Sequence, residues 1–169
     1  METRILRGTG ARVSRVCLGS MTFGQQVDET EADRILSSAL DAGINFVDTA
    51  DVYVNGASER ILGKLLKGKR DTVVLASKVG SPREDGDPRT SGLNKWHIVK
   101  GVEESLKRLQ TDCLDILYLH RPDRSAPVEE TLDACDLLVR QGKVHYIATS
   151  NHSSWKMMEL ELKSESKGY

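Results

Sequence analysis

The stretch INFVDTADVYVNGASERILGKLL, residues 44–66, decides the fold. It opens with a short apolar run containing β-branched residues, which is typical of a strand buried on both faces of a parallel sheet. Its second half places apolar residues at three- and four-residue spacing, which predicts an amphipathic helix, with Ser58 as its N-cap and Gly68 after its end. The stretch therefore predicts a strand, a loop and a helix in succession.

The same unit recurs along the chain. Strands are predicted at VCLGS (16–20), INFVDTA (44–50), TVVLAS (72–77), LDILYL (114–119) and VHYIAT (144–149). Helical patterns lie between them, one with Asp28 and Glu31 as a capping box and another following Asn94. Five β/α units predict a parallel sheet with right-handed crossovers, and alternation alone leaves an open doubly wound sheet and a closed barrel as alternatives.

Two irregular segments accompany these units. RILRGTGARVSR (4–15) predicts a hairpin that turns at Gly8-Thr9-Gly10. The sequence favours this hairpin over a dinucleotide fingerprint, because Val13 stands where the third glycine of the fingerprint belongs and no buried strand precedes it. GSPREDGDPRTSG (80–92) is rich in proline and glycine and is interpreted either as a functional loop or as disorder.

Composition narrows the class of protein. The 169 residues suit one domain, spanning 1–169, and 24 basic against 25 acidic residues give a net charge of −1. The longest basic run is KGKR (67–70), so nucleic-acid and membrane-surface binding are not expected. Three cysteines in apolar stretches predict reduced core thiols and a cytoplasmic location. The first ten residues lack the apolar core of a signal peptide, and no run is long enough to span a membrane.

Polar side chains interrupt three successive strands at their carboxyl ends. Asp48 follows INFV, Lys78 follows VVLAS and His120 follows ILYL, while Tyr53 lies in the loop after Asp48. Parallel α/β folds place their chemistry at this edge of the sheet. We therefore expect the four side chains to cluster, with Lys78 within salt-bridge reach of Asp48.

These residue types suit the reduction of a carbonyl group. A carbonyl that accepts hydride needs a proton at its oxygen, which a tyrosine hydroxyl can donate. A lysine ammonium beside the phenol favours the phenolate form, and the Asp48 carboxylate would keep a buried lysine charged. His120 could hydrogen-bond the carbonyl oxygen and orient the substrate.

Four segments resemble signature sequences of the aldo-keto reductases. They are FVDTADVYVNGASERILGKLL (46–66), LASKVG (75–80), DILYLHRPD (115–123) and IATSNHSSW (147–155), in the family's order and spacing. The resemblance implies a TIM (β/α)8-barrel fold and the use of NADPH to reduce a small-molecule aldehyde or ketone. It assigns catalysis to Asp48, Tyr53, Lys78 and His120.

The resemblance also implies cofactor contacts. Ser150 and Asn151 would hold the nicotinamide amide, and the backbone of Gly19-Ser20-Met21 would approach the cofactor, as would Asp48. Ser150 and Asn151 could also form a helix start with Asn151 as the N-cap, which is compatible with cofactor binding.

Several other residues have a structural interpretation beside a functional one. Glu59 is interpreted mainly as a first-turn acid that the helix dipole stabilises. Arg121 could face the substrate or solvent. Trp96 and Trp155, on helical patterns, are expected to pack. The four histidines show no spacing of metal ligands, so no metal site is expected.

A complete barrel of this type takes about 200–250 residues, whereas five β/α units are present here. The resemblance implies that later units would supply further cofactor contacts. The alternative function is therefore a catalytically inactive barrel fragment that self-associates or needs a complementing C-terminal segment. Unpaired edges on VCLGS and VHYIAT would be the surfaces for self-association.

Overall fold

A computed structural model describes residues 1–82 and 88–169, and its centre is a five-stranded parallel sheet. The strands follow one another in chain order as β3-β4-β5-β6-β7, so the alternation predicted from sequence is confirmed. Their bounds are β3 Leu18–Gly19, β4 Phe46–Asp48, β5 Val74–Val79, β6 Leu114–Leu119 and β7 Val144–Thr149. Part of the predicted 80–92 loop, residues 83–87, lies outside the described residues.

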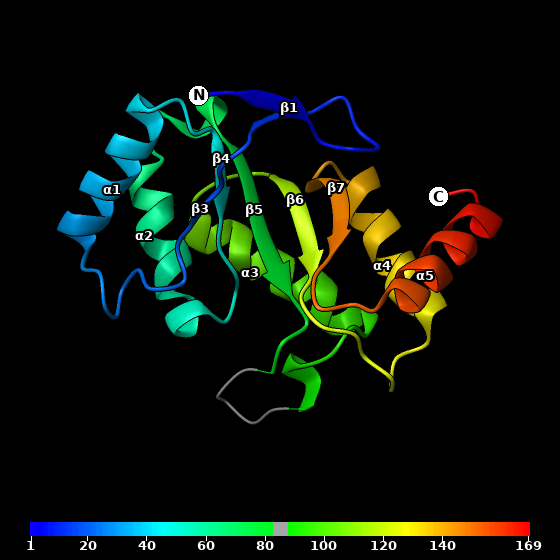
Figure 1. The fold of residues 1–169 in the computed structure, drawn as a ribbon. Helices are drawn as coiled ribbons and strands as arrows, with labels where there is room; N and C mark the ends of the chain where they lie inside the picture. Colours follow the sequence, from blue (N-terminus) through cyan, green and yellow to red (C-terminus); the bar gives the residue numbers. More distant parts are fainter. Residues whose placement is uncertain (83–87) are drawn as a thin grey trace.

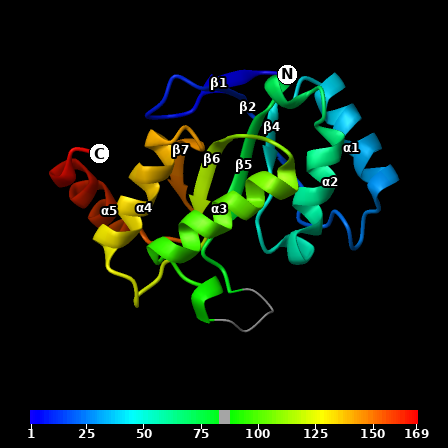
Figure 2. The ribbon, with the colours of Figure 1, turned by 180° about the vertical axis from the view of Figure 1, so that it is seen from behind.

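The helices lie along one side of the curved sheet, as the two opposite views show (Figures 1 and 2). They are α1 Glu29–Asp41, α2 Ala57–Leu65, α3 Lys95–Leu109, α4 Val128–Arg140 and α5 Ser154–Lys167. Short 3-10 turns cover Tyr53–Gly56 (η1), Arg70–Thr72 (η2) and Pro88–Thr90 (η3). The apolar core fills the space between sheet and helices, with fully buried side chains such as Leu36, Leu62, Ile98, Leu117 and Leu138. Burying these aliphatic side chains supplies the main stabilisation, at about 25 cal/mol per Å2.

The predicted N-terminal hairpin is confirmed. Strands β1 (Thr3–Ile5) and β2 (Arg12–Ser14) pair antiparallel. The hairpin lies across the end of the sheet opposite to the strand arrowheads (Figure 1). Asn45, just before β4, binds it through its Oδ1, which accepts from the backbone N–H of Ser14 at 2.7 Å. The carboxyl ends of the strands, at the other end, stay free of it.

The helix cap predicted at Asp28 is confirmed, and the caps predicted at Ser58 and Asn151 are wrong. Asp28 and Asn94 accept the backbone N–H of Glu31 and His97, respectively. Ser58 does not cap α2, because the helix already begins at Ala57 after a left-handed Gly56. Asn151 does not cap α5, because the N-cap position is Ser153.

The expectation that Trp96 and Trp155 pack against the core is wrong. Trp96 and Trp155 are 64% and 66% exposed rather than packed, because an apolar spacing on a helix produces packing only where another element covers that face. All three cysteines are free, but only Cys135 is buried; Cys113 is partly buried, and the expectation of a core thiol is wrong for Cys17, which is exposed. Burial raises the pKa of the Cys135 thiol to about 12.

Candidate active site

The three polar residues predicted at strand ends lie beside one another. In the parallel register, Asp48 of β4 pairs with Ala76 of β5, and Lys78 of β5 pairs with Tyr118 of β6. His120 follows β6, and its backbone N–H donates to the Val79 carbonyl at 2.9 Å. Because strands of this sheet are neighbours in chain order, successive strand ends bring these side chains to one rim.

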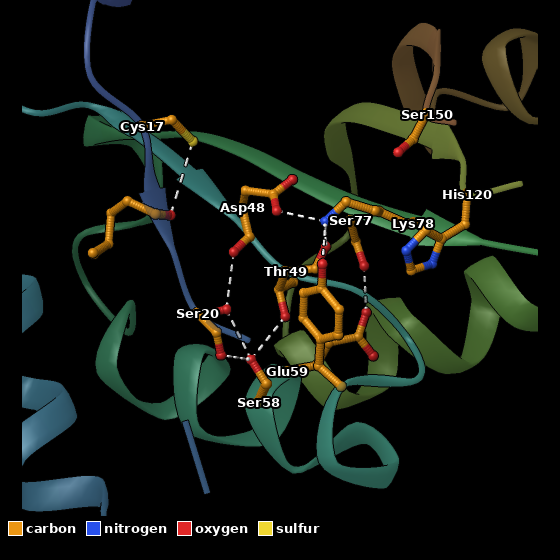
Figure 3. A network of polar contacts seen from close by, with 12 residues as sticks. Cys17, Ser20, Asp48, Thr49, Ser58, Glu59, Ser77, Lys78, His120 and Ser150 are labelled. Atoms are coloured by element: carbon orange, nitrogen blue, oxygen red, sulfur yellow. Dashed lines mark hydrogen bonds and ion pairs between the residues drawn. The ribbon is translucent and has the colours of Figure 1, made fainter. Parts of the chain in front are cut away.

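Lys78 is the centre of the group. Its Nζ donates to Asp48 Oδ1 at 2.5 Å, to the Thr49 carbonyl at 2.8 Å and to the Tyr53 hydroxyl at 3.0 Å. The Lys78 side chain is only 9% exposed and that of Asp48 is 22% exposed. Burial raises the pKa of the Asp48 carboxyl, and the ammonium of Lys78 opposes that rise. The ammonium thus touches both a carboxylate and a phenol, as predicted (Figure 3 shows the Asp48–Lys78 contact).

Tyr53 is positioned by an unusual turn. It begins the 3-10 turn η1, in which Val54 and Asn55 both have left-handed backbone angles, with φ of 49° and 51°. Left-handed angles are rare for a β-branched residue such as valine and cost about 1–3 kcal/mol. The surrounding structure therefore has to hold this turn, and with it the Tyr53 side chain.

His120 lies against Tyr53. Their ring centroids are 6.0 Å apart in an edge-on arrangement with an interplanar angle of 83°. Burial, together with the positive charges of Lys78 and Arg121, lowers the pKa of His120 to about 4, so its imidazole is neutral at pH 7. Among the described residues, its buried Nδ1 has no hydrogen-bond partner. A neutral imidazole with one unused nitrogen can orient a polar ligand.

The predicted cofactor loop of residues 19–21 lies beside Asp48. Gly19 pairs with Asp48 in the sheet register, and no atom lies within 4 Å of where a side chain at Gly19 would begin. The Ser20 hydroxyl is not available to a ligand there, because it donates to the Asp48 carbonyl and contacts the Ser58 hydroxyl at 2.8 Å. Met21 is exposed. The open backbone at Gly19 and the exposed Met21 are thus the accessible parts of this segment.

Ser150 and Asn151 follow β7 on the far side of His120. The Asn151 side-chain amide donates to the His120 carbonyl at 2.8 Å and to the Ser150 hydroxyl at 3.0 Å, so it links the ends of β6 and β7. In Figure 3 Ser150 lies above His120 and apart from the Asp48–Lys78 pair. Arg121 is exposed and acts on the site through its charge.

Several polar residues of this rim were not predicted. Tyr118 shares the register and face of Lys78, whose Nζ lies 6.0 Å from its ring centroid. Ser77 and Thr49 are fully buried and join α2 to the strand ends. Tyr118 lies two residues before His120, so the alternation of side chains along β6 was an available signal for Tyr118. No sequence signal linked Ser77 to α2, which lies 18 residues earlier in the chain.

Other parts of the structure do not compete with this rim as a centre of chemistry. A cavity of about 640 Å3 opens between β7, α4 and α5, but none of the four predicted catalytic residues lines it. Within residues 1–82 and 88–169, no group of three or more acidic, histidine or cysteine side chains could hold a metal ion. In the same part of the chain, none of the helices has the length and apolar character needed to cross a membrane.

Comparison with known proteins defines the class to which this fold and rim belong. The chain is a member of the aldo/keto reductase family, whose model matches residues 15–168. The aldo-keto reductase AKR11C1 from Bacillus halodurans, solved in its holo form, superposes with a TM-score of 0.85 at 38% identity. That likeness covers 94% of this chain and 53% of the other, so the sheet and helices correspond to about five units of a TIM-type barrel.

Curated relatives agree with this placement. The chain is 42% identical over 179 residues to the uncharacterized oxidoreductase YrpG of Bacillus subtilis, covering all of this chain and 55% of that protein. It is 39% identical to a probable voltage-gated potassium channel subunit beta of Arabidopsis thaliana, covering 94% of this chain and 49% of that protein. The chain thus spans about half the length of the relatives it matches.

Proposed function

We propose that this protein is an NADPH-dependent oxidoreductase that reduces aldehydes or ketones to alcohols, with Tyr53 as the general acid. The observation that carries the proposal is the position of Lys78 Nζ, bonded at once to the Asp48 carboxylate and the Tyr53 hydroxyl. Membership in the aldo/keto reductase family supports the reaction class. The similarity to the oxidoreductase YrpG and to AKR11C1, which was solved in its holo form, supports a bound cofactor.

Each side chain has a role in this proposal. The Tyr53 hydroxyl donates its proton to the carbonyl oxygen as the carbonyl carbon accepts hydride. The Lys78 ammonium stabilises the phenolate that remains, and Asp48 keeps that ammonium charged in its buried position. The neutral His120 imidazole orients the carbonyl oxygen toward Tyr53.

The residues at the rim fit a nicotinamide cofactor, which supplies the hydride when bound. The unused buried Nδ1 of His120 offers a polar contact, and Gly19 leaves open space beside Asp48. Ser150 and Asn151 carry the amide and hydroxyl groups that can bind a carboxamide. The 3.0 Å contact between Lys78 Nζ and the Tyr53 hydroxyl places the proton donor directly beside the ammonium, at the same rim.

The test has two parts. Titration of the protein with NADPH, followed by nicotinamide fluorescence, measures binding, and loss of absorbance at 340 nm with an aromatic aldehyde measures turnover. Tyr53→Phe removes the donor and should lower kcat by about 10²-fold or more while NADPH binding is retained. A Tyr53→Phe protein with undiminished aldehyde reduction would eliminate Tyr53 as the acid.

Self-association through the sheet edge is part of the same proposal. The outer side of α5 exposes Trp155, Met158 and Leu162, at positions i, i+3 and i+7 of one helix face. Strand β7 is at one end of the sheet order, so it can pair with another chain. Sedimentation velocity across a hundredfold range of concentration tests this, and a single monomer boundary throughout would refute it.

The three free cysteines support a cytoplasmic location.

A further inference from the structure

Glu59 of α2 is fully buried and has two partners. Its Oε1 accepts from the Ser77 hydroxyl at 2.6 Å, and its Oε2 accepts from Arg108 Nε at 2.6 Å. The expectation that Glu59 serves only the helix dipole is incomplete, because its carboxylate links three separate elements, α2, β5 and α3. A buried carboxylate without such partners would be costly, so both contacts are required by its position.

The first contact fixes the strand that carries Lys78. Ser77 immediately precedes Lys78 in β5, and successive side chains of a strand point to opposite faces. The Ser77 hydroxyl therefore holds β5 from the helix side while Lys78 reaches into the rim. Figure 3 shows this arrangement, with Glu59 and Ser77 joined beneath the Lys78–Asp48 contact.

The second contact supports the turn that carries Tyr53. Arg108 extends from α3 under η1, and its Cδ lies 2.7 Å from where a Cβ on Gly56 would sit. That turn contains the left-handed residues Val54 and Asn55, so its shape depends on the packing beneath it. Glu59 fixes the Arg108 guanidinium at 2.6 Å, and the ion pair thereby supports the left-handed turn.

The adjoining residue Ser58 acts on the strand of Asp48 in the same way. Its hydroxyl donates to the Ser20 carbonyl at 2.8 Å and lies 2.9 Å from the Thr49 hydroxyl. Thr49 directly follows Asp48, as Ser77 directly precedes Lys78. Two consecutive residues of α2 thus hold the residues that flank both members of the ion pair.

From these contacts we infer that the buried Glu59–Arg108 ion pair is a positioning device for the proton donor. Through Ser77 it sets the place of Lys78, and through Arg108 it sets the turn of Tyr53. The inference rests on the proposed carbonyl reduction for its effect on rate, but its geometric part can be measured without turnover.

The experiment compares Ser77→Ala and Glu59→Gln with a matched control. Ser77→Ala removes only the hydroxyl that donates to Glu59 and keeps the Cβ, so this variant is expected to fold. It therefore tests the inference even if Glu59→Gln unfolds. The control, Asp115→Asn, also breaks an arginine ion pair that holds β5, because Asp115 bonds Arg70 at 2.8 Å and the backbone N–H of Leu75 at 2.8 Å. Asp115 is the second residue of β6, at the end of the sheet away from the rim, and its partners are Arg70, Leu75 and His145.

Two readouts are taken on the full chain. In the first, kcat for aldehyde reduction falls about tenfold or more in Ser77→Ala and Glu59→Gln with little change in KM, because a small misplacement of the reacting groups is costly. Asp115→Asn keeps its kcat although its melting temperature falls. Equal kcat in all four proteins, after correction for the folded fraction, would overturn the inference.

The second readout is the NMR titration of the His120 imidazole, because its pKa depends on its burial and on the nearby ammonium of Lys78. In the two rim variants its pKa rises from about 4 toward 6.5, whereas Asp115→Asn leaves it unchanged. This readout separates the two proposals: if the unchanged protein reduces no carbonyl, the proposed function fails and the His120 titration alone decides the inference. An identical titration in all proteins would then refute it.

Discussion

Replacing Lys78 by methionine removes the ammonium while keeping an unbranched side chain of similar length. The lost interaction can be calculated from the structure, because Nζ lies 3.0 Å from the Tyr53 hydroxyl oxygen. At that separation a cation stabilises a full negative charge by about 5.5 kcal/mol at an effective dielectric constant of about 20, and by about 1.4 kcal/mol in water. These limits correspond to rate losses of about 10⁴-fold and about tenfold. The burial of Lys78 places the expected loss in kcat at about 10²-fold or more.

The variant also leaves Asp48 without its cation, which gives a signature that depends on pH. Burial already raises the pKa of Asp48, and removal of Lys78 takes away the charge that opposes the rise. A carboxyl whose folded-state pKa lies above its unfolded value destabilises the fold while ionised, and this cost disappears as pH falls through the folded pKa. The stability difference between Lys78→Met and the unchanged protein should therefore be largest near pH 7 and shrink on acidification.

Steady-state aldehyde reduction and urea unfolding, each measured from pH 5 to pH 8, check both parts. The matched control is Lys64→Met, because Lys64 pairs with Glu29 at 2.6 Å on the helix surface, where an ion pair contributes little. A Lys78→Met protein with unchanged kcat, or with a stability loss that grows on acidification, would refute the reasoning.

Three further predictions concern stability and dynamics. Since the pKa of His120 is lowered to about 4, below its usual 6.5, the stability of the protein should fall as pH drops from about 6.5 toward about 4, and urea unfolding of His120→Gln should show a weaker fall. Gly63→Ala should lower the free energy of unfolding by about 1–3 kcal/mol, because its Cβ would lie 2.5 Å from the Arg108 carbonyl oxygen. Gly10→Ala, whose Cβ would lie in open space, should change the free energy of unfolding little. Equal effects of the two substitutions would contradict this packing. Helix α5 has no buried residue and contacts α4 through exposed ion pairs such as Lys163–Glu129. In 1 M salt, which screens such pairs, the amide hydrogens of α5 should therefore exchange faster relative to those of α3. An unchanged ratio of the two exchange rates would show that ion pairs do not hold α5.

The sequence predicted the repeated architecture well, because its apolar periods reflect burial directly. The strands at 114–119 and 144–149 have the predicted bounds. The strand predicted at 16–20 extends only over Leu18–Gly19, at one end of the sheet order, where Val16 is half exposed and Cys17 is exposed. Apolar composition favours a strand, but the ladder forms only where a partner strand is in register.

The rim was predictable as far as topology determines it. Asp48, Lys78 and His120 come together because successive parallel strands end at one edge, and the loop between β4 and α2 is short enough to bring Tyr53 to them. The role of Glu59 was not predictable, because Arg108 lies 49 residues further along the chain. A contact over that distance leaves no periodic pattern in the sequence. Ser58 was misassigned for a related reason: its hydroxyl bonds other strands, and the left-handed Gly56 begins the helix instead.

The most direct test of the central claim follows the hydride and the proton separately. NADPH deuterated at the transferring C4 position is incubated with the protein and an aldehyde, and the alcohol is analysed by mass spectrometry. The proposed reaction predicts one deuterium on the carbinol carbon of the product from the unchanged protein. It also predicts a rate at least about 10²-fold lower for Tyr53→Phe at unchanged NADPH affinity. An alcohol without deuterium, or equal rates for the two proteins, would contradict the assignment of carbonyl reduction to the Asp48–Tyr53–Lys78–His120 group.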